Sequence, residues 1–386
     1  MKKETKLLLA GRNPENNHGI VNPPVYHAST ITYPTVADME HASGTPYEGV
    51  RYGLRGTTTT FALEDAVTEL EGGYRSIAVC SGLAAVTASL TAFLKTGDRV
   101  LMTDTVYDPT RHFCDSNLKR YGIDTHYYDP MIGAGIADLI DDNTRVIFLE
   151  SPGSLTFEMQ DVPAIVAAAK ARGIITIMDN TWAAGYFFRP LEHGVDVSLQ
   201  AGTKYIGGHS DLMMGTITTT EEAFTAVKRE CSVIGLHAAP DDCYLALRGI
   251  RTLAARLARH QESALKIAQW MQGRDEVAQV LHPALTSCPG HDIWKRDFTG
   301  SSGLFSIVLD DRYEKAAVDA MLDGMELFPM GYSWGGYESL MIPADPTSIR
   351  TATNWTGGPL MRLHVGLEDT DDLIADLEKG FGRLNA

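Results

Sequence analysis

The sequence predicts an α/β protein with a mostly parallel sheet, helices on both faces of that sheet, and a smaller α+β domain after it. One observation is that short apolar runs alternate with segments of helical periodicity between residues 61 and 240, a pattern that builds parallel sheets. A second is that this regular alternation ends near residue 240, where a long helical stretch, 241–273, begins. A third is the length of 386 residues, which exceeds the size at which one hydrophobic core usually stops growing. We therefore expect an N-terminal arm over 1–60, a large domain over 61–240 and a C-terminal domain over 241–386.

The predicted arm lacks regular apolar periodicity. It is rich in Asn, Pro, Gly and Thr, and it includes the runs Asn22-Pro23-Pro24 and Gly53-Leu54-Arg55-Gly56. A structureless stretch of this length is uncommon unless it is functional or forms an interaction arm. We expect residues 1–60 to make such an arm.

The large domain is predicted from a regular alternation of elements. Apolar residues recur at helical spacing from Leu63 to Leu70, and Gly72-Gly73 ends that helix. Ser81-Gly82 opens a helix of small residues that runs to Lys95, and Asp161 caps a further helix. Another helix is predicted at 109–121, and the predicted strands lie at 77–80, 99–103, 123–128, 145–150, 174–179, 195–200 and 215–219.

The C-terminal domain is predicted to be of α+β type. Its expected elements are the helix 241–273, a strand at 304–309, a helix at 313–323, a strand at 361–365 and a last helix from 371 that Asp369 caps. Gly331, Gly335 and Gly336, near Ser333-Trp334, mark a tight loop.

Composition excludes several classes of function. There are 33 basic and 49 acidic residues, for a net charge of −16, whereas general nucleic-acid binding needs a basic surface. The five cysteines have no Cys-x-x-Cys spacing, so we expect neither a metal site nor a disulfide framework but reduced thiols. No stretch is long and apolar enough for a membrane span. We expect a soluble cytoplasmic protein with no nucleic-acid or membrane partner.

Two charged residues stand at the ends of predicted strands. Asp179 closes the run Ile174–Met178, and Lys204 follows the strand 195–200. In an open α/β sheet that edge is where ligands bind. Pyridoxal phosphate (PLP) needs a lysine amine for its covalent attachment and an acidic partner for its pyridine nitrogen. The alternative for either residue alone is a solvated loop lysine or a helix-capping aspartate.

Other candidates fit the same cofactor. Gly82 opens a helix whose N-terminus favours a phosphate, although any strand–glycine–helix junction looks similar. Thr203 offers a further phosphate hydrogen bond. Tyr107, after a strand, is placed to stack on the ring, although a tyrosine there is more often simple packing. Arg362 lies within an apolar strand, where its partner is either a substrate carboxylate or a structural ion pair.

The chain resembles the Cys/Met-metabolism family of fold-type I PLP-dependent enzymes nearly from end to end. Within that family it is most similar to the bacterial cystathionine β-lyases. The motifs that carry the resemblance are Asn22-Pro23-Pro24-Val25, Tyr52-Gly53, Ser81-Gly82, Glu150-Ser151-Pro152-Gly153-Ser154, Asp179-Asn180-Thr181-Trp182, Thr203-Lys204-Tyr205, Gly207-Gly208-His209-Ser210-Asp211, Tyr332-Ser333-Trp334-Gly335-Gly336 and Arg362-Leu363-His364-Val365-Gly366. The resemblance implies the fold-type I architecture of a seven-stranded sheet between helices.

The resemblance also implies roles for single residues. Lys204 matches the lysine that carries PLP and acts as the base, Asp179 the partner of the pyridine nitrogen, and Tyr107 the ring-stacking tyrosine. Positions that contact the cofactor phosphate are matched by Gly82, Leu83 and Thr203. Arg362 matches the arginine that binds the substrate carboxylate, with Ser333 and Trp334 beside it. Tyr52 matches a tyrosine that the neighbouring subunit inserts into the active site, so the family's active unit is a dimer, usually within a tetramer.

Two departures from the family pattern concern the distal part of the site. The family has Tyr-x-Arg where this chain has Tyr52-Gly53-Leu54, so the arginine that grips the phosphate of the partner subunit's PLP is replaced by Leu54. Arg55 matches a residue of the distal substrate pocket in β-lyases, and the alternative is that it binds the cofactor phosphate in place of the missing arginine. His112 stands where β-lyases carry an acidic residue, and Glu230 is retained.

The implied activity is PLP-dependent carbon–sulfur β-elimination, the conversion of L-cystathionine to L-homocysteine, pyruvate and ammonia in methionine biosynthesis. The alternatives are a cystathionine γ-lyase or γ-synthase, or a cysteine-conjugate lyase. Alanine racemisation is a possible side activity, because it begins with the same proton removal. A binding protein with little bound PLP is the alternative outside enzymes.

Overall fold

The large sheet positions most of the predicted site. The computed structural model describes residues 1–45 and 47–386, and its seven-stranded sheet has the order β1-β7-β6-β5-β4-β2-β3. Strands β3, β2, β4, β5 and β6 are parallel, and β7 is antiparallel to both of its neighbours. The strand bounds are β1 Arg75–Val79, β2 Arg99–Thr103, β3 Asp124–Tyr128, β4 Thr144–Glu150, β5 Ile175–Asp179, β6 Val197–Ala201 and β7 Gly215–Thr219. The prediction of a mostly parallel sheet is confirmed.

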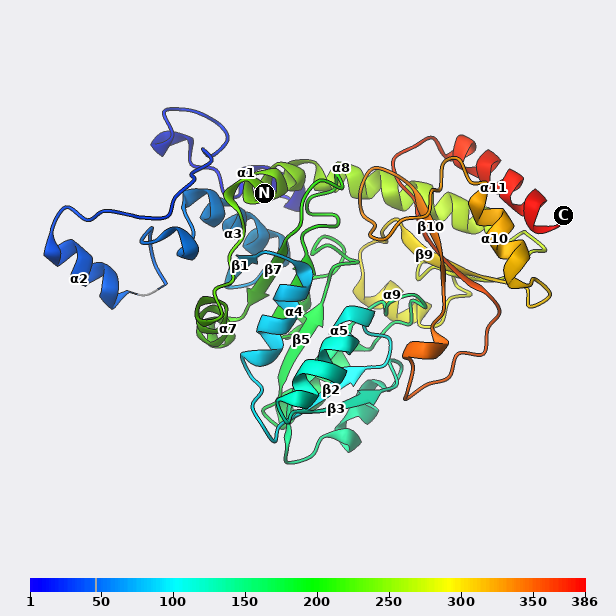
Figure 1. Ribbon diagram of the computed structural model, residues 1–386, viewed down its shortest axis with the longest axis horizontal. Coiled ribbons are helices and arrows are strands. Elements are labelled where there is room, and N and C mark those ends of the chain that lie inside the picture. Colours follow the sequence, from blue (N-terminus) through cyan, green and yellow to red (C-terminus); the bar gives the residue numbers. More distant parts are fainter. Residues whose placement is uncertain (46) are drawn as a thin grey trace.

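Helices cover both faces of this sheet (Figure 1). Their bounds are α3 Thr58–Glu71, α4 Gly82–Thr91, α5 Asp108–Phe113, α6 Val162–Ala171 and α7 Glu221–Val233. Successive side chains of a strand point to opposite faces, and β2 shows this directly. Val100 and Met102 pack in the core under α4 and α7, whereas Leu101 packs in the core with α3 and α6. The two cores explain why the strands read as continuous apolar runs.

The C-terminal part contains a second, antiparallel sheet of order β10-β11-β9-β8. The strands are β8 Val277–Leu281, β9 Leu304–Leu309, β10 Leu340–Ala344 and β11 Leu360–His364. The helices are α8 Pro240–Met271, α9 His291–Asp297, α10 Lys315–Asp323 and α11 Thr370–Leu384. The 32-residue α8 runs from the large sheet to the small one (Figure 1). The predicted boundaries at residues 60 and 240 stay a prediction.

Some elements differ from the sequence-based expectation. The first 60 residues contain two helices, α1 Lys3–Leu9 and α2 Val36–Gly44, and α1 is held because Leu7 is buried against α3 and α8. The helix predicted at 109–121 is divided, since α5 ends at Phe113 and a π-helical turn follows at Cys114–Leu118. In the part of the chain that the structure describes, no helix combines the length and apolar character that a bilayer crossing requires.

A glycine of α8 brings this helix close to the loop that follows Lys204. A Cβ at Gly249 would overlap the carbonyl oxygens of Ile206 and Gly207. We expect Gly249→Ala to lower the free energy of unfolding by about 1–3 kcal/mol, the usual cost of overpacking. The matched control is Gly382→Ala in α11, where a Cβ meets nothing within 4 Å and alanine should stabilise the helix by roughly 0.5–1 kcal/mol. Urea unfolding followed by circular dichroism measures both; equal midpoints for the two variants would contradict this packing.

Candidate active site

One cavity of about 350 Å³ collects most of the predicted site residues. It lies between the C-terminal edge of the large sheet and the loop that precedes β10. Residues far apart in the sequence meet in it. The predicted residues that line it are Gly82, Leu83, Tyr107, Asp179, Thr203, Lys204, Ser333, Trp334 and Arg362.

Lys204 lies in the turn after β6, inside this cavity. Its amine donates a hydrogen bond to Ser333 Oγ at 2.6 Å and lies 5.3 Å from the centroid of the Trp334 ring. Burial, and then the positive charge of Arg362, lower the pKa of Lys204 to about 8, although the charge of Asp179 acts in the opposite direction. An amine with this pKa has a substantial neutral fraction near neutral pH, which a base or nucleophile needs.

Asp179 ends β5 with one carboxylate oxygen already bonded. Asp179 Oδ1 accepts hydrogen bonds from the backbone N–H and the hydroxyl of Thr181, at 2.9 and 2.5 Å. Burial raises the pKa of Asp179 despite these two donors. A cationic N–H group brought to this carboxylate would favour its charged form.

Glu150 is a cavity residue that the sequence analysis placed in a motif but not in the site. It ends β4, directly opposite Asp179 in the parallel pairing of β4 and β5. Its Oε2 accepts the backbone N–H of Tyr107 at 2.8 Å. Burial, and then the charge of Asp179, raises the pKa of Glu150 well above its usual value. The raised pKa favours the protonated form of Glu150, whereas the two hydrogen bonds from Thr181 favour the charged form of Asp179.

The start of α4 forms another wall. Ser81 caps this helix by accepting the N–H of Ala84 at 3.0 Å. Gly82 and Leu83 lie in the first helical turn, where backbone N–H groups have no intrahelical acceptor and favour an anion. A Cβ at Gly82 would lie 2.7 Å from the Cβ of Ala201, so only glycine fits there. The hydroxyl of Thr203 already pairs with the backbone of Met214, and its predicted phosphate contact stays a prediction.

Arg362 projects into the cavity from the middle of β11. Its Nη2 donates to the carbonyl oxygen of Ser333 at 3.2 Å, and burial lowers the pKa of its guanidinium. Among residues 1–45 and 47–386, no carboxylate forms an ion pair with Arg362. The structural ion pair that the sequence left open is thus not present in the described chain, and a buried guanidinium without an anion favours an anionic ligand.

The loop that carries Ser333 is fixed by a histidine that the sequence analysis passed over. The N–H of Gly335 donates to Nε2 of His364 at 3.1 Å. His364 is buried, and burial followed by the charge of His260 lowers its pKa well below the usual value, so it stays neutral. Ser333 has a positive φ of 83° and Gly335 one of 84°, conformations that non-glycine residues rarely adopt. The constrained loop holds Ser333 against Lys204.

Four predicted residues lie outside this cavity in the single chain. Tyr52 is half exposed and borders a different pocket with Leu54. Arg55 lines a small cavity with residues of α7, the helix that also carries Glu230. His112 is exposed on α5. The expected role of Tyr52 involves a neighbouring subunit, and Arg55, His112 and Glu230 are expected in the distal substrate pocket. These roles stay predictions.

Comparison with known proteins shows which family the chain matches. The model of the family described as Cys/Met metabolism PLP-dependent enzyme matches residues 4–382. The chain is 46% identical over 388 residues to a protein from Salmonella typhimurium named cystathionine beta-lyase, covering 99% of this chain and 98% of that one. It is 41% identical over 396 residues to a Wolbachia pipientis protein named L-alanine/L-glutamate racemase, covering 100% of this chain and 98% of that one.

The fold is shared with solved structures. A crystal structure of cystathionine gamma synthase from Xanthomonas oryzae pv. oryzae in complex with cystathionine superposes with a TM-score of 0.91, at 29% identity and with coverage of 100% and 99% of the two chains. The expected fold-type I architecture is confirmed by this match and by the two sheets. Family model, relatives and fold agree, and the chain belongs to the Cys/Met metabolism family of PLP-dependent enzymes.

Proposed function

We propose that this protein is a PLP-dependent carbon–sulfur β-lyase that converts L-cystathionine and water to L-homocysteine, pyruvate and ammonia. The observation that carries the proposal is the grouping in one cavity of a half-buried lysine, a half-buried aspartate and a half-buried arginine that has no anionic partner among the described residues. The name of the Salmonella typhimurium relative and the cystathionine bound in the Xanthomonas oryzae structure support the choice of substrate.

The residues of the cavity fit PLP. Lys204 would hold it covalently, and Asp179 would pair with its pyridine N–H, which answers the need of this buried carboxylate for a cationic partner. The backbone N–H groups of Gly82 and Leu83 would hold its phosphate, and the missing Cβ of Gly82 lets the start of α4 lie against Ala201. Tyr107 would cover one face of the ring. When bound, PLP supplies an electron sink for the pair left at the substrate Cα after proton removal.

Each protein group then has a physical task. Arg362 binds the substrate carboxylate and so fixes the direction of the Cα–H bond. Lys204, released when substrate binds, is neutral often enough to take the Cα proton and, once charged, can donate a proton to the departing homocysteine sulfur. The raised pKa of Glu150 favours its protonated form, which avoids a second negative charge beside Asp179. Ser333 orients the Lys204 amine through their hydrogen bond.

The assembly and location are part of the proposal. We infer a dimer of active sites, within a tetramer, in which Tyr52 and Arg55 of one subunit reach the cavity of another, with His112 and Glu230 in the distal pocket. The half-exposed Tyr52 and the N-terminal segment that extends away from the body of the molecule (Figure 1) support this arrangement. The five cysteines, all free in the described chain, support a reducing compartment such as the cytoplasm.

A second candidate activity is racemisation of alanine. It is favoured by the Wolbachia pipientis relative named L-alanine/L-glutamate racemase. The chemistry begins with the same Cα proton removal and differs only in the face from which the proton returns. A γ-elimination would instead release the sulfur from Cγ and give 2-oxobutyrate.

The products distinguish these activities. With L-cystathionine we expect pyruvate, ammonia and homocysteine in equal amounts, because elimination occurs at Cβ of the half that Arg362 holds. Coupled keto-acid assay and chromatography measure the products, and D-alanine formed from L-alanine measures racemisation. Release of 2-oxobutyrate and cysteine would overturn the β-lyase assignment.

Removal of the Lys204 amine tests the proposed base. Lys204→Ala is expected to lower kcat by roughly 10²–10⁴-fold or more, the usual contribution of general base catalysis, because no other amine lines the cavity in the described chain. Lys3→Ala is the matched control, since burial also lowers the pKa of Lys3 to about 8 but Lys3 lies outside this cavity. Similar losses in the two variants would mean that Lys204 has no special role.

The pKa of Lys204 gives a pH test that needs no substrate. In protein stripped of cofactor, amine-selective labelling followed by peptide mass spectrometry should show half-maximal reactivity of Lys204 near pH 8, because the neutral amine reacts. Arg362→Leu removes a nearby positive charge, so the pKa of Lys204 should rise and the midpoint should move to higher pH. The midpoint of Lys3, whose pKa Arg362 does not affect, serves as the internal reference. An unchanged midpoint for Lys204 would show that the two cations do not interact.

A further inference from the structure

A segment of the small domain reaches across to the large one. We call residues 345–357, which connect β10 to β11, the strap. In Figure 1 this orange segment descends from the small sheet toward β2 and β3. The strap does not line the cavity, so its contacts must act through other residues.

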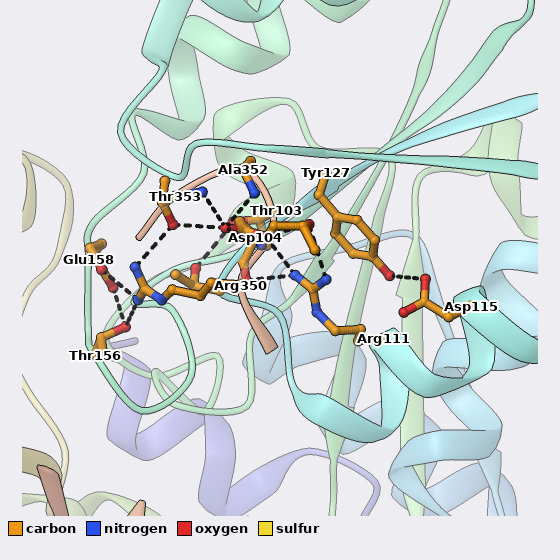
Figure 2. Close-up of polar contacts among 12 residues, drawn as sticks. Thr103, Asp104, Arg111, Asp115, Tyr127, Thr156, Glu158, Arg350, Ala352 and Thr353 are labelled. Atoms are coloured by element: carbon orange, nitrogen blue, oxygen red, sulfur yellow. Dashed lines mark hydrogen bonds and ion pairs between the residues drawn. The ribbon is translucent and has the colours of Figure 1, made fainter. Parts of the chain in front are cut away.

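The strap is held by a buried aspartate at the end of β2. Asp104 has no exposed surface, and its carboxylate accepts three successive backbone N–H groups of the strap (Figure 2). These donors are Thr351 at 2.9 Å, Ala352 at 3.1 Å and Thr353 at 2.8 Å. The hydroxyls of Thr351 and Thr353 donate to the same carboxylate at 3.2 and 2.8 Å. Consecutive N–H groups that converge in this way make an anion-binding concavity, and here the anion is a side chain of the other domain.

The same carboxylate closes the turn that carries Tyr107. Arg111 donates through Nη2 to Asp104 Oδ1 at 2.7 Å and to the Asp104 carbonyl oxygen at 3.0 Å. Its guanidinium is buried and lies 3.6 Å from the centroid of the Tyr127 ring, so Arg111 has little freedom to move. Tyr107 lies between the two partners in sequence, and its own N–H is held by Glu150.

An ion pair ties the strap to another segment of the cavity wall. Arg350 Nη2 contacts Glu158 Oε1 at 2.8 Å, with 6% and 15% of the two side chains exposed, and Arg350 also donates to Thr156 (Figure 2). Between these partners lies Phe157, which lines the cavity with a positive φ of 59°. The strap therefore contacts two segments that line the cavity. It binds the segment of Tyr107 through Asp104 and the segment of Phe157 through Arg350.

We propose that Asp104 is a positioning residue for the reaction: by binding the strap and Arg111 together, it fixes the turn that holds Tyr107 over the cavity. This inference rests on the proposed function, in which Tyr107 covers the cofactor. Asp104 itself touches neither substrate nor cofactor. Burial alone would raise the pKa of Asp104, but hydrogen bonds from Thr351, Thr353 and Arg111 bring it below the ordinary value, so the charged form that the donors require persists at neutral pH.

The test uses the PLP-loaded enzyme and the isosteric variant Asp104→Asn. This change keeps the shape but removes the charge and turns an amide toward the strap N–H groups. Asp345→Asn is the matched control, because Asp345 belongs to the same strap but is exposed and bonds only within it, to Thr347. We expect Asp104→Asn to change the visible circular dichroism of bound PLP and to lower kcat about 10- to 100-fold, the effect of a misplaced group. Asp345→Asn should leave both at the wild-type value.

A double-mutant cycle decides whether the effect passes through Tyr107. If it does, Asp104→Asn should lower kcat little or not at all when introduced into Tyr107→Ala, because coupled sites are not additive. Fully additive losses of kcat in the double variant would overturn the proposal. So would an Asp104→Asn enzyme that loses thermal stability but keeps the wild-type dichroism and kcat. If Asp104→Asn fails to fold, Thr353→Val, which removes one donor, must show the same dichroic change in smaller degree, and its absence counts against the proposal.

These readouts separate the two claims. The dichroism and the cycle can be measured with whichever amino acid the enzyme turns over, so a different substrate would overturn only the β-lyase assignment. Failure of the wild-type protein to bind PLP would overturn the proposed function itself.

Discussion

The balance of buried charge in one cavity is the constraint on which the rest of the site depends. Lys204 and Arg362 are two cations taken out of water, and Asp179 is the single carboxylate among the predicted residues that faces them. The raised pKa of Glu150 favours its protonated form, so this residue contributes little negative charge. Burying unpaired charge is costly, so the cavity favours anionic ligands. A phosphate and a substrate carboxylate would supply the missing negative charge. Repulsion between the two cations contributes to the low pKa of Lys204, which suits its proposed role as a base.

The fold creates this balance by bringing two independent sheets to one place. Parallel strands β4 and β5 end side by side, which sets Glu150 against Asp179. Strand β11 of the small sheet carries Arg362, and neutral His364 in the same strand holds the loop of Ser333 against Lys204. The site therefore depends on the relation between the domains, and the contacts of the strap with Asp104 and Glu158 stabilise that relation from outside the cavity.

Much of this was accessible from sequence because the residues involved stand at strand ends. Lys204, Asp179 and Gly82 follow apolar runs, and a parallel sheet must bring such positions to one edge. The pairing of Glu150 with Asp179 could not be predicted from the sequence, because it depends on the order of the strands in the sheet. The partners of Asp104 in the strap are 247 residues or more away in the sequence, so no local pattern marks them. Helix α1 was missed because it is held by the packing of Leu7 rather than by its own periodicity, and α2 has no buried residue that a periodic pattern could mark. The proposed role of Tyr52 involves a second subunit.

The central claim is that Lys204 removes the Cα proton of an amino acid whose carboxylate Arg362 holds. Deuterium uptake at Cα tests it most directly: PLP-loaded enzyme is incubated with L-alanine, which has no leaving group, in deuterated water, and the recovered alanine is analysed by mass spectrometry. The account predicts steady incorporation of one deuterium at Cα by the wild-type enzyme, much slower incorporation by Arg362→Leu, and none above background by Lys204→Ala. Incorporation by Lys204→Ala at the wild-type rate would contradict the account, because the base would then have to be another group.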